Sequence, residues 1–374
     1  MKTPAFTFRT SCLALLAASL FILPSSFLSG CRRTDVREMT VSMPGLVESD
    51  KAKVVEALSK YAGVEKDSYK WDMQAKTLTL RYDSMQVAQA NIRYAIDEKG
   101  VKVAFPEKKD DRAGKSKAKI STFALHVYEV MEKKGLTMQQ AVDAFKAVGV
   151  TGFDGEYTDP RLDEIAAAGL KPAMIYGVMS FRDPAKDEIE QAKYLARAKS
   201  LGAKYMMIVP DHMTGIKDDP SDPVYEREFL KTIDGLKRLV AKCKAAGICP
   251  LVEDFGYRTN PGSHFCNLKR YFAEIPDLSF ALDTGNVMFS DRGTDILEEF
   301  EYFHDKIRHV HVKDHPKGGP QAYALPGEGV VPNEKMLRQL FSEGYDGWVT
   351  LELFDAPDMM EAVTKTCAFI NSCR

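Results

Sequence analysis

The sequence predicts an α/β protein: a (β/α)8 TIM barrel over residues 119–374, preceded by an α+β domain of ferredoxin-like βαββαβ order over residues 31–105. Three observations support this prediction. From residue 119 onward, a short apolar segment followed by a helical pattern recurs eight times. No GxGxxG motif follows the first segment, which disfavours a doubly wound open sheet. The shorter region before the repeats has its own order of strand and helix patterns.

Composition and charge limit the class of protein. The 374 residues carry 51 basic and 53 acidic side chains, and 45% of the residues are apolar. These values are typical of a globular protein, and the balanced charge argues against a nucleic-acid-binding protein. Seven cysteines, none in CxxC spacing, are too few for a disulfide scaffold.

The first 30 residues are typical of an export signal. A basic start precedes an apolar stretch from Cys12 to Leu28. The motif LSGC, which ends at Cys31, resembles the lipobox of bacterial lipoproteins. That resemblance implies cleavage before Cys31, lipidation of this cysteine and attachment to the membrane of the bacterial cell envelope. Arg32 favours the outer membrane in such proteins, and the alternative is an ordinary signal peptide with an incidental cysteine.

The next region is expected to form the small domain. Its patterns predict strands at Arg37–Met43, Tyr69–Met73, Thr77–Tyr82 and Val101–Phe105, and helices at Asp50–Tyr61 and Met85–Glu98. The region resembles heavy-metal-associated domains, which bind metal through two cysteines after the first strand. No cysteine lies between Cys31 and Cys243, so we expect the fold without the metal function. We therefore expect the small domain either to dock a protein partner or to serve as a spacer.

Residues 106–118 are highly charged and are expected to be an exposed linker. The eight repeats follow. Their strands are expected at Ile120–His126, Gly152–Glu156, Pro172–Gly177, Tyr205–Val209, Pro250–Glu253, Leu278–Asp283, Ile307–Lys313 and Trp348–Leu353. Their helices are expected at Thr137–Val148, Pro160–Ala168, Ala185–Leu201, Val224–Ala246, Leu268–Ile275, Ile296–Phe303, Asn333–Glu343 and Pro357–Ser372.

Four metal-competent side chains stand at the ends of the last four predicted strands: Glu253, Asp283, His311 and Glu352. The C-terminal ends of barrel strands meet at one mouth, where chemistry takes place in such barrels. Gathering three carboxylates and an imidazole is costly unless a cation compensates for it. The donor set suits one divalent ion, which could be Mn²⁺, Mg²⁺, Co²⁺ or Zn²⁺.

Lys313 is a catalytic candidate from its position alone. It lies two residues after His311 and therefore shares its strand face, where its ammonium could stabilise an oxyanion. The first four predicted strands also offer polar side chains at or near their ends. The candidate substrate-binding residues there are His126, Glu156, Tyr176 and His212. A fifth candidate is Asn286, three residues after Asp283, which can form a hydrogen bond with a substrate hydroxyl.

The segments LVEDFG, FALDTGNVMF, RHVHVKD, PGEGVVP and VTLELF resemble the xylose isomerase-like barrels of the sugar phosphate isomerase/epimerase superfamily, over residues 119–374. The family's metal ligands map onto the four residues named above. The resemblance also implies that Glu253 and Glu352 act as acid and base, moving a proton next to a carbonyl through an enediolate. Asn286 stands where many relatives carry histidine, which disfavours a second metal and the family's DNA-repair branch.

We therefore expect a divalent-metal-dependent sugar isomerase or epimerase. Because the chain resembles an exported protein, its substrate is expected to be a non-phosphorylated sugar or keto-sugar. One alternative is a keto-sugar dehydratase or glycoside lyase that uses the same site. Another is a lipid-anchored, non-catalytic sugar-binding protein. Deuterium uptake from solvent favours epimerisation, an unsaturated product favours elimination, and the four intact ligands speak against a mere binding protein.

Overall fold

The computed structural model describes residues 36–83, 86–87, 89–104, 116–257, 259–290, 295–317 and 323–374. The predicted signal segment, Cys31 and residues 106–115 of the predicted linker lie outside these residues. Among the described residues, no helix combines the length and the apolar character that crossing a membrane requires.

The small domain has a three-stranded antiparallel sheet of order β1-β3-β2. Its elements are β1 (Val36–Ser42), α1 (Asp50–Leu58), β2 (Val64–Asp72), β3 (Thr77–Asp83) and α2 (Gln89–Glu98). Apolar side chains from one face of the sheet and from both helices, among them Val41, Leu80 and Ile92, form its core.

The fourth strand predicted at Val101–Phe105 is not found as a strand in the described part of this segment. Its valines, Val101 and Val103, are buried, but Ala104 forms only an isolated bridge with Ser42 at the end of β1. The described sheet therefore has three strands and does not confirm the ferredoxin-like order. Apolar burial holds this segment in place without a continuous ladder of backbone hydrogen bonds.

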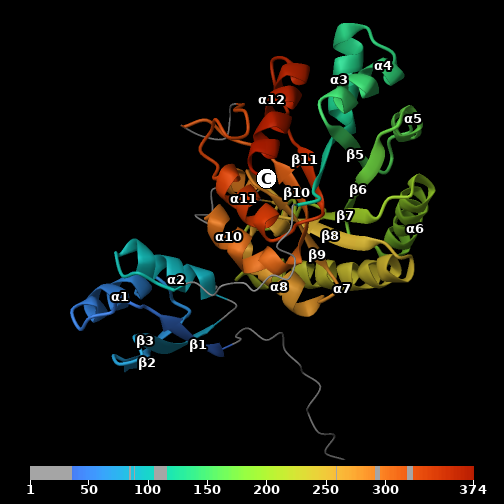
Figure 1. The fold of residues 1–374 in the computed structure, drawn as a ribbon. Coiled ribbons are helices and arrows are strands. Elements are labelled where there is room, and N and C mark those ends of the chain that lie inside the picture. Colours follow the sequence, from blue (N-terminus) through green and yellow to red (C-terminus); the bar gives the residue numbers. More distant parts are fainter. Residues whose placement is uncertain are drawn as a thin grey trace, which may run out of the picture. The chain divides into compact units, whose positions relative to one another are not determined.

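The large domain is a closed barrel of eight parallel strands, which confirms the predicted TIM barrel (Figure 1). Around the barrel, the strand order is β10-β11-β4-β5-β6-β7-β8-β9. The strands are β4 (Lys119–Phe123), β5 (Val150–Glu156), β6 (Lys171–Met179), β7 (Tyr205–Pro210), β8 (Cys249–Glu253), β9 (Ser279–Asp283), β10 (Ile307–Val312) and β11 (Trp348–Leu351).

Helices follow the strands and lie on the outside of the barrel (Figure 1). They are α3 (Ala124–Lys134), α4 (Met138–Ala147), α5 (Leu162–Ala168), α6 (Pro184–Leu201), α7 (Pro223–Ala245), α8 (Phe265–Glu274), α9 (Asn286–Ser290), α10 (Ile296–Phe303), α11 (Asn333–Ser342) and α12 (Met359–Ser372), with short 3₁₀ turns at Pro261–Ser263 and His304–Lys306.

Local sequence signals explain where several helices begin. Thr137 and Gln140 form a reciprocal capping box at the start of α4. Asp183 and Asp222 cap α6 and α7 with their side chains, and each is followed by a proline in the first turn. These caps satisfy backbone N–H groups that would otherwise lack partners at the helix starts.

The sequence placed the end of the first barrel strand too late. The strand β4 ends at Phe123, and the unpredicted helix α3 begins at Ala124, so that His126 lies in the first turn of that helix. Val127, Tyr128 and Val130 on α3 are buried in the layer between the strands and the helices. Because a short apolar run fits either a strand or a buried helix, its periodicity alone does not distinguish the two.

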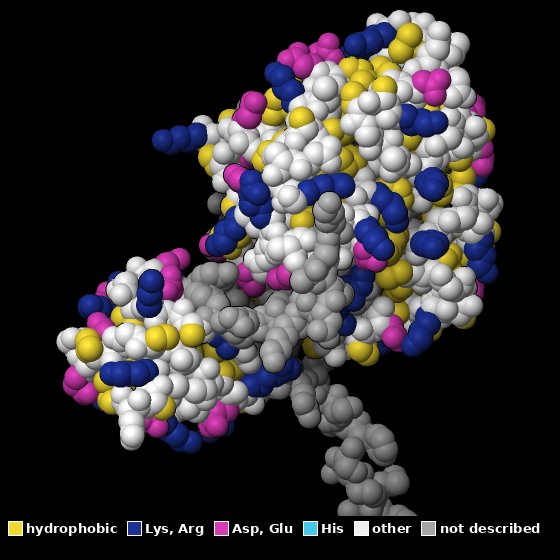
Figure 2. Space-filling model, in the orientation of Figure 1, with side chains coloured by type: hydrophobic (Ala, Val, Ile, Leu, Met, Phe, Trp, Pro, Cys, Tyr) yellow, Lys and Arg dark blue, Asp and Glu magenta, His cyan; other side chains and the backbone are white. Residues whose placement is uncertain are grey.

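Inside the barrel, a small apolar cluster is formed by Met174, Met207, Val209, Leu251 and Ala281. Trp348 is also buried and packs against β5, where a Cβ added to Gly152 would lie 2.6 Å from a carbon of the indole ring. On the face of the molecule seen in Figure 2, acidic and basic side chains are both scattered, and neither sign forms a continuous patch.

Candidate active site

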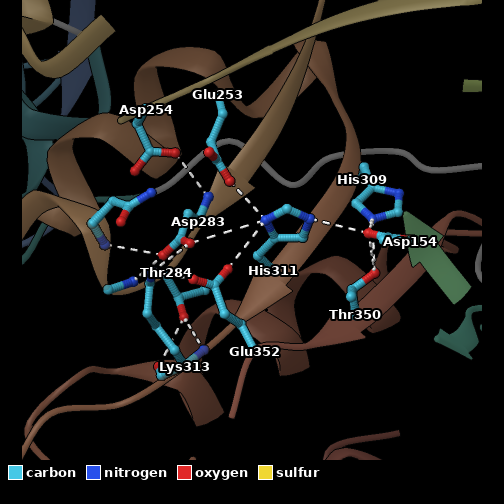
Figure 3. Close-up of polar contacts among 12 residues, drawn as sticks. Asp154, Glu253, Asp254, Asp283, Thr284, His309, His311, Lys313, Thr350 and Glu352 are labelled. Atoms are coloured by element: carbon cyan, nitrogen blue, oxygen red, sulfur yellow. Dashed lines mark hydrogen bonds and ion pairs between the residues drawn. The ribbon is translucent and has the colours of Figure 1, made fainter. Parts of the chain in front are cut away.

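The four predicted ligands come together at the C-terminal ends of adjacent strands. Glu253 and Asp283 are the last residues of β8 and β9, His311 lies near the end of β10, and Glu352 follows β11. Each offers one ligand atom, and these four atoms all lie within 4.8 Å of one another. Figure 3 shows the side chains pointing toward a common centre beside His311.

The imidazole of His311 is at the centre of this cluster. Its Nδ1 lies 2.6 Å from Oε1 of Glu253, 3.4 Å from Oε2 of Glu352 and 4.0 Å from Oδ2 of Asp283. The parallel register of the sheet fixes this geometry, since His311 pairs with Asp283 across β9 and with Thr350 across β11.

Lys313 faces the same centre from the end of β10. Its Nζ lies 2.9 Å from Oδ2 of Asp283 and 2.6 Å from Oε1 of Glu352. When the three carboxylates are ionised and the imidazole is neutral, as binding to a metal requires, the ammonium of Lys313 leaves a net charge of −2 on the cluster. A divalent cation offsets that charge, and the oxygen and nitrogen donors suit such an ion. The residues present therefore fit a divalent metal.

The pKa values in the cluster reflect burial and mutual charge. Burial, together with the charge of Glu352, raises the pKa of Asp283 well above its ordinary value. Burial alone would raise the pKa of Glu352, but Lys313 and His311 lower it to about 2. Burial opposes protonation of His311, but the neighbouring Glu253 raises its pKa well above the ordinary value. Asp283 and His311 therefore retain their protons, whereas Glu352 is ionised.

Backbone groups fix the orientation of Asp283. Its Oδ1 accepts hydrogen bonds from the N–H groups of Gly285 and Asn286 at 2.8 and 3.0 Å. Its own N–H donates to Oδ1 of the buried Asp254 at 2.7 Å. Oδ2 is thereby left directed at Lys313 and the common centre (Figure 3).

A second polar group lies deeper in the barrel, beside the first (Figure 3). Oδ2 of Asp154 on β5 lies 2.7 Å from Nε2 of His309 and 3.1 Å from Nε2 of His311. The Thr350 hydroxyl donates to the same oxygen at 2.9 Å. Burial alone would raise the pKa of Asp154, but the two imidazoles lower it to about 2.

Two of the substrate-binding candidates lie close to this centre. His126 is buried, with its Nδ1 3.0 Å from the Thr122 hydroxyl, and its Nε2 has no hydrogen-bond partner among the described residues. Burial lowers the pKa of His126 to about 4. Tyr176 packs edge-on against Phe123, whose ring lies 5.1 Å from that of His311.

The other three candidates differ in position. Asn286 is buried and contributes its backbone N–H to Asp283. Glu156 is exposed at the end of β5 and accepts a hydrogen bond from the nearby Thr158. His212 follows β7, where its Nδ1 lies 2.6 Å from the Thr259 hydroxyl and its ring packs against Phe255. Neither Glu156 nor His212 belongs to the ligand cluster.

The sequence identified the PGEG segment but not what holds it. Asp314 accepts hydrogen bonds from the N–H groups of Gly327, Gly329 and Val331 at 2.9, 3.2 and 2.9 Å. A Cβ added to Gly329 would lie 2.1 Å from Oδ1 of Asp314. Asp314 is the residue that follows Lys313, so its carboxylate holds this loop against the end of β10.

Asp154 and His309 were also missed. Both could have been found from strand alternation, because His309 is two residues before His311 and therefore shares its face of β10. Asp154 lies inside the predicted strand at residues 152–156, but alternation within one strand does not show which partner it faces across the barrel.

Two curated relatives illustrate the range of similarity. Fructoselysine 3-epimerase of Escherichia coli O157:H7 is 34% identical over 58 residues, which are 16% of this chain and only 21% of that protein. This chain therefore aligns with about a fifth of that relative's length. Inosose dehydratase of Lacticaseibacillus casei is 24% identical over 260 residues, which are 60% of this chain and 84% of that protein.

Two solved structures share the fold. The 3-keto-D-glucoside 4-epimerase of E. coli has a TM-score of 0.51 at 16% identity and covers 69% of this chain and 100% of its own. The IolI protein, solved with a bound zinc atom, has a TM-score of 0.50 at 18% identity, with 68% and 96% coverage.

A family model described as a xylose isomerase-like TIM barrel matches residues 128–373, which is nearly the whole of the large domain. The relatives with similar sequences include an epimerase and a dehydratase, both of which act as enzymes. The chain belongs to the xylose isomerase-like TIM barrel family and, like these relatives, is an enzyme.

Proposed function

We propose that this protein is a divalent-metal-dependent sugar isomerase or epimerase that moves a proton next to a carbonyl, with a non-phosphorylated sugar or keto-sugar as substrate. One observation carries the proposal: Glu253 and Glu352 converge on His311 from different strands, at 2.6 and 3.4 Å from its Nδ1. Two carboxyl groups around one centre allow one to remove a proton and the other to return it.

The exposure of the cluster separates these roles. The side chains of Asp283 and His311 are at most 1% exposed, whereas Glu253 and Glu352 retain 6% and 13%. This difference supports the proposed roles of the two glutamates as acid and base, in addition to their place among the four ligands. Asp283 and His311 would act as ligands alone.

Lys313 completes the charge arrangement. A bound divalent ion would supply Lewis-acid polarisation of a carbonyl oxygen. The ammonium of Lys313, held between Asp283 and Glu352, provides a second positive charge toward which negative charge on the substrate can develop. Lys313 also stabilises the ionised form of Glu352, the form that a general base requires.

The comparisons support this assignment by reaction class. The relatives include a fructoselysine 3-epimerase, and a solved structure of the same fold is a 3-keto-D-glucoside 4-epimerase. Both names describe epimerisation of a sugar derivative. The zinc in the IolI structure supports a metal in this fold.

A dehydratase is the second candidate, and a specific observation favours it. Inosose dehydratase is similar to this chain over 84% of its own length, which is far more than the epimerase match covers. Dehydration would begin with the same proton removal, followed by loss of a hydroxyl group from the neighbouring carbon instead of return of the proton.

Metal content tests the site. We expect the full chain, purified in mild detergent, to hold about one divalent ion per chain. Asp283→Asn should lose most of this ion, because Oδ2 of Asp283 faces the common centre. Glu156→Gln, which alters an exposed carboxylate at the same barrel mouth, should retain it. Elemental analysis by mass spectrometry measures both. A wild-type chain that binds no Mn²⁺, Co²⁺, Mg²⁺ or Zn²⁺ would contradict the proposal.

Solvent isotope exchange tests the chemistry. We expect keto-sugars incubated with the protein in D₂O to gain deuterium next to the carbonyl. Glu253→Gln and Glu352→Gln should each slow this exchange by about 10²- to 10⁴-fold, since each removes one acid–base group. Glu361→Gln, on the outer surface of α12, should leave the rate unchanged. An unsaturated product in place of the epimer would favour the dehydratase, and neither product from the metal-loaded protein would refute both.

The pH dependence of stability tests whether His126 stays neutral. The folded-state pKa of His126 is about 4, against an ordinary 6.5, so the unfolded chain takes up a proton first as the pH falls. Stability should therefore fall from pH 7 to pH 5, by about 2 kcal/mol from this group alone. Urea unfolding measures the free energy of unfolding at pH 7 and at pH 5. Between these two pH values, His126→Gln should lose about 2 kcal/mol less of this free energy than the wild type. Equal losses would show that His126 is not buried in its neutral form.

We also propose that the chain is anchored to the cell-envelope membrane through a lipid on Cys31, as the LSGC motif suggests. In bacterial cells given labelled palmitate, the protein should carry the label and sediment with membranes. Cys31→Ala should remove the label, whereas Cys12→Ala, within the signal segment, should not. Labelling that persists in Cys31→Ala would exclude this anchor.

A further inference from the structure

The second ring nitrogen of His311 faces away from the candidate metal centre. Its Nδ1 points to Glu253, Asp283 and Glu352, whereas its Nε2 lies 3.1 Å from Oδ2 of Asp154 (Figure 3). A neutral imidazole carries one proton on one of its two nitrogens. A metal ligand at Nδ1 therefore requires the proton on Nε2, and a carboxylate facing Nε2 favours that tautomer.

Asp154 is itself held from the other side. Its Oδ2 lies 2.7 Å from Nε2 of His309 and accepts a hydrogen bond from the Thr350 hydroxyl at 2.9 Å. The Ser121 hydroxyl lies 2.6 Å from that of Thr350. All four of these side chains are completely buried. The position of this carboxylate is thus fixed by contacts with β10 and β11, and Ser121 on β4 in turn contacts Thr350.

Asp154, His309 and His311 are also close enough together to hold a metal ion of their own. The contacts favour a different role. Nε2 of each histidine and the Thr350 hydroxyl are all directed at the same carboxylate oxygen, which is an arrangement of hydrogen bonds around an acceptor. A metal at this position would have to displace all three hydrogen bonds in a fully buried space.

We propose that Asp154 is a positioning residue, which orients His311 by accepting the proton on its Nε2 so that Nδ1 faces the metal. This inference rests on the proposed function, because it assumes that Glu253, Asp283, His311 and Glu352 form the metal site. Asp154 does not touch the substrate. Its effect on catalysis is transmitted through the ring of His311, and His309 and Thr350 hold it in place.

Metal affinity tests the role directly. Chelator competition with Mn²⁺ or Zn²⁺ on the full chain should show that Asp154→Asn raises the metal Kd about 10- to 100-fold, at an unchanged one ion per chain. Ser121→Ala, at the far end of the same buried network, should change the Kd less than about twofold. An unchanged Kd in Asp154→Asn, or a second ion in the wild type that this variant loses, would overturn the proposal.

A metal-free measurement separates this proposal from the proposed function. In the wild type, the Nε2–H of His311 should give a strongly downfield proton resonance by NMR, absent in His311→Gln and lost or shifted in Asp154→Asn. This outcome does not depend on whether any metal binds. A resonance that is the same in Asp154→Asn would overturn the positioning role. If Asp154→Asn does not fold, Thr350→Val, which removes one hydrogen bond to Asp154 at similar volume, should shift the same resonance, and an unshifted resonance would count against the proposal.

Discussion

The repulsion among three carboxylates, two buried and one largely buried, is the constraint on which the site depends. Glu253, Asp283 and Glu352 surround Nδ1 of His311 within 4.0 Å, in a place where water can offset little of their charge. Lys313 compensates for one charge by bonding to two of the three. The remaining negative charge of the ionised cluster favours the binding of a cation there. The same imbalance would make the removal of Lys313 more damaging than the loss of an ordinary surface ion pair.

The barrel makes this concentration of charge possible because it fixes each carboxylate by a different strand. In the parallel ladders His311 pairs with Asp283, and Glu253 pairs with Ala281, two residues before Asp283. These backbone ladders leave the side chains little freedom to move apart. Below them, the apolar cluster around Met207 and Leu251 fills part of the interior. The hydrogen bonds of Asp154 occupy another part. The site is thus supported from beneath by both packing and hydrogen bonding.

The barrel and the convergence of the four ligands at one mouth could both be predicted from the sequence, because both follow from a repeating pattern. Short apolar strands and regular spacing are local signals, and the ends of parallel strands must meet. Contacts across the barrel are not local: Asp154 meets His309 over 155 positions. The sequence did not predict helix α3, which contains His126, because the apolar run at its start fits the period of a strand as well as that of a helix. The fourth strand predicted in the small domain was not found for a different reason. Its residues alternate between buried and exposed as predicted, but in the described part they form only one isolated bridge.

In the proposed mechanism, epimerisation and elimination share their first step, so elimination depends on a group that can protonate the leaving group. His126 remains neutral near pH 7 because burial lowers its pKa to about 4, and burial raises the pKa of the Tyr176 hydroxyl. Neither is a strong acid at that pH. In the proposed mechanism, proton donation is therefore left to Glu253 or Glu352, the pair proposed for epimerisation. The proposed mechanism thus makes the substrate set the outcome: one with a leaving group beside the acidic carbon would undergo elimination, and one without it would be epimerised.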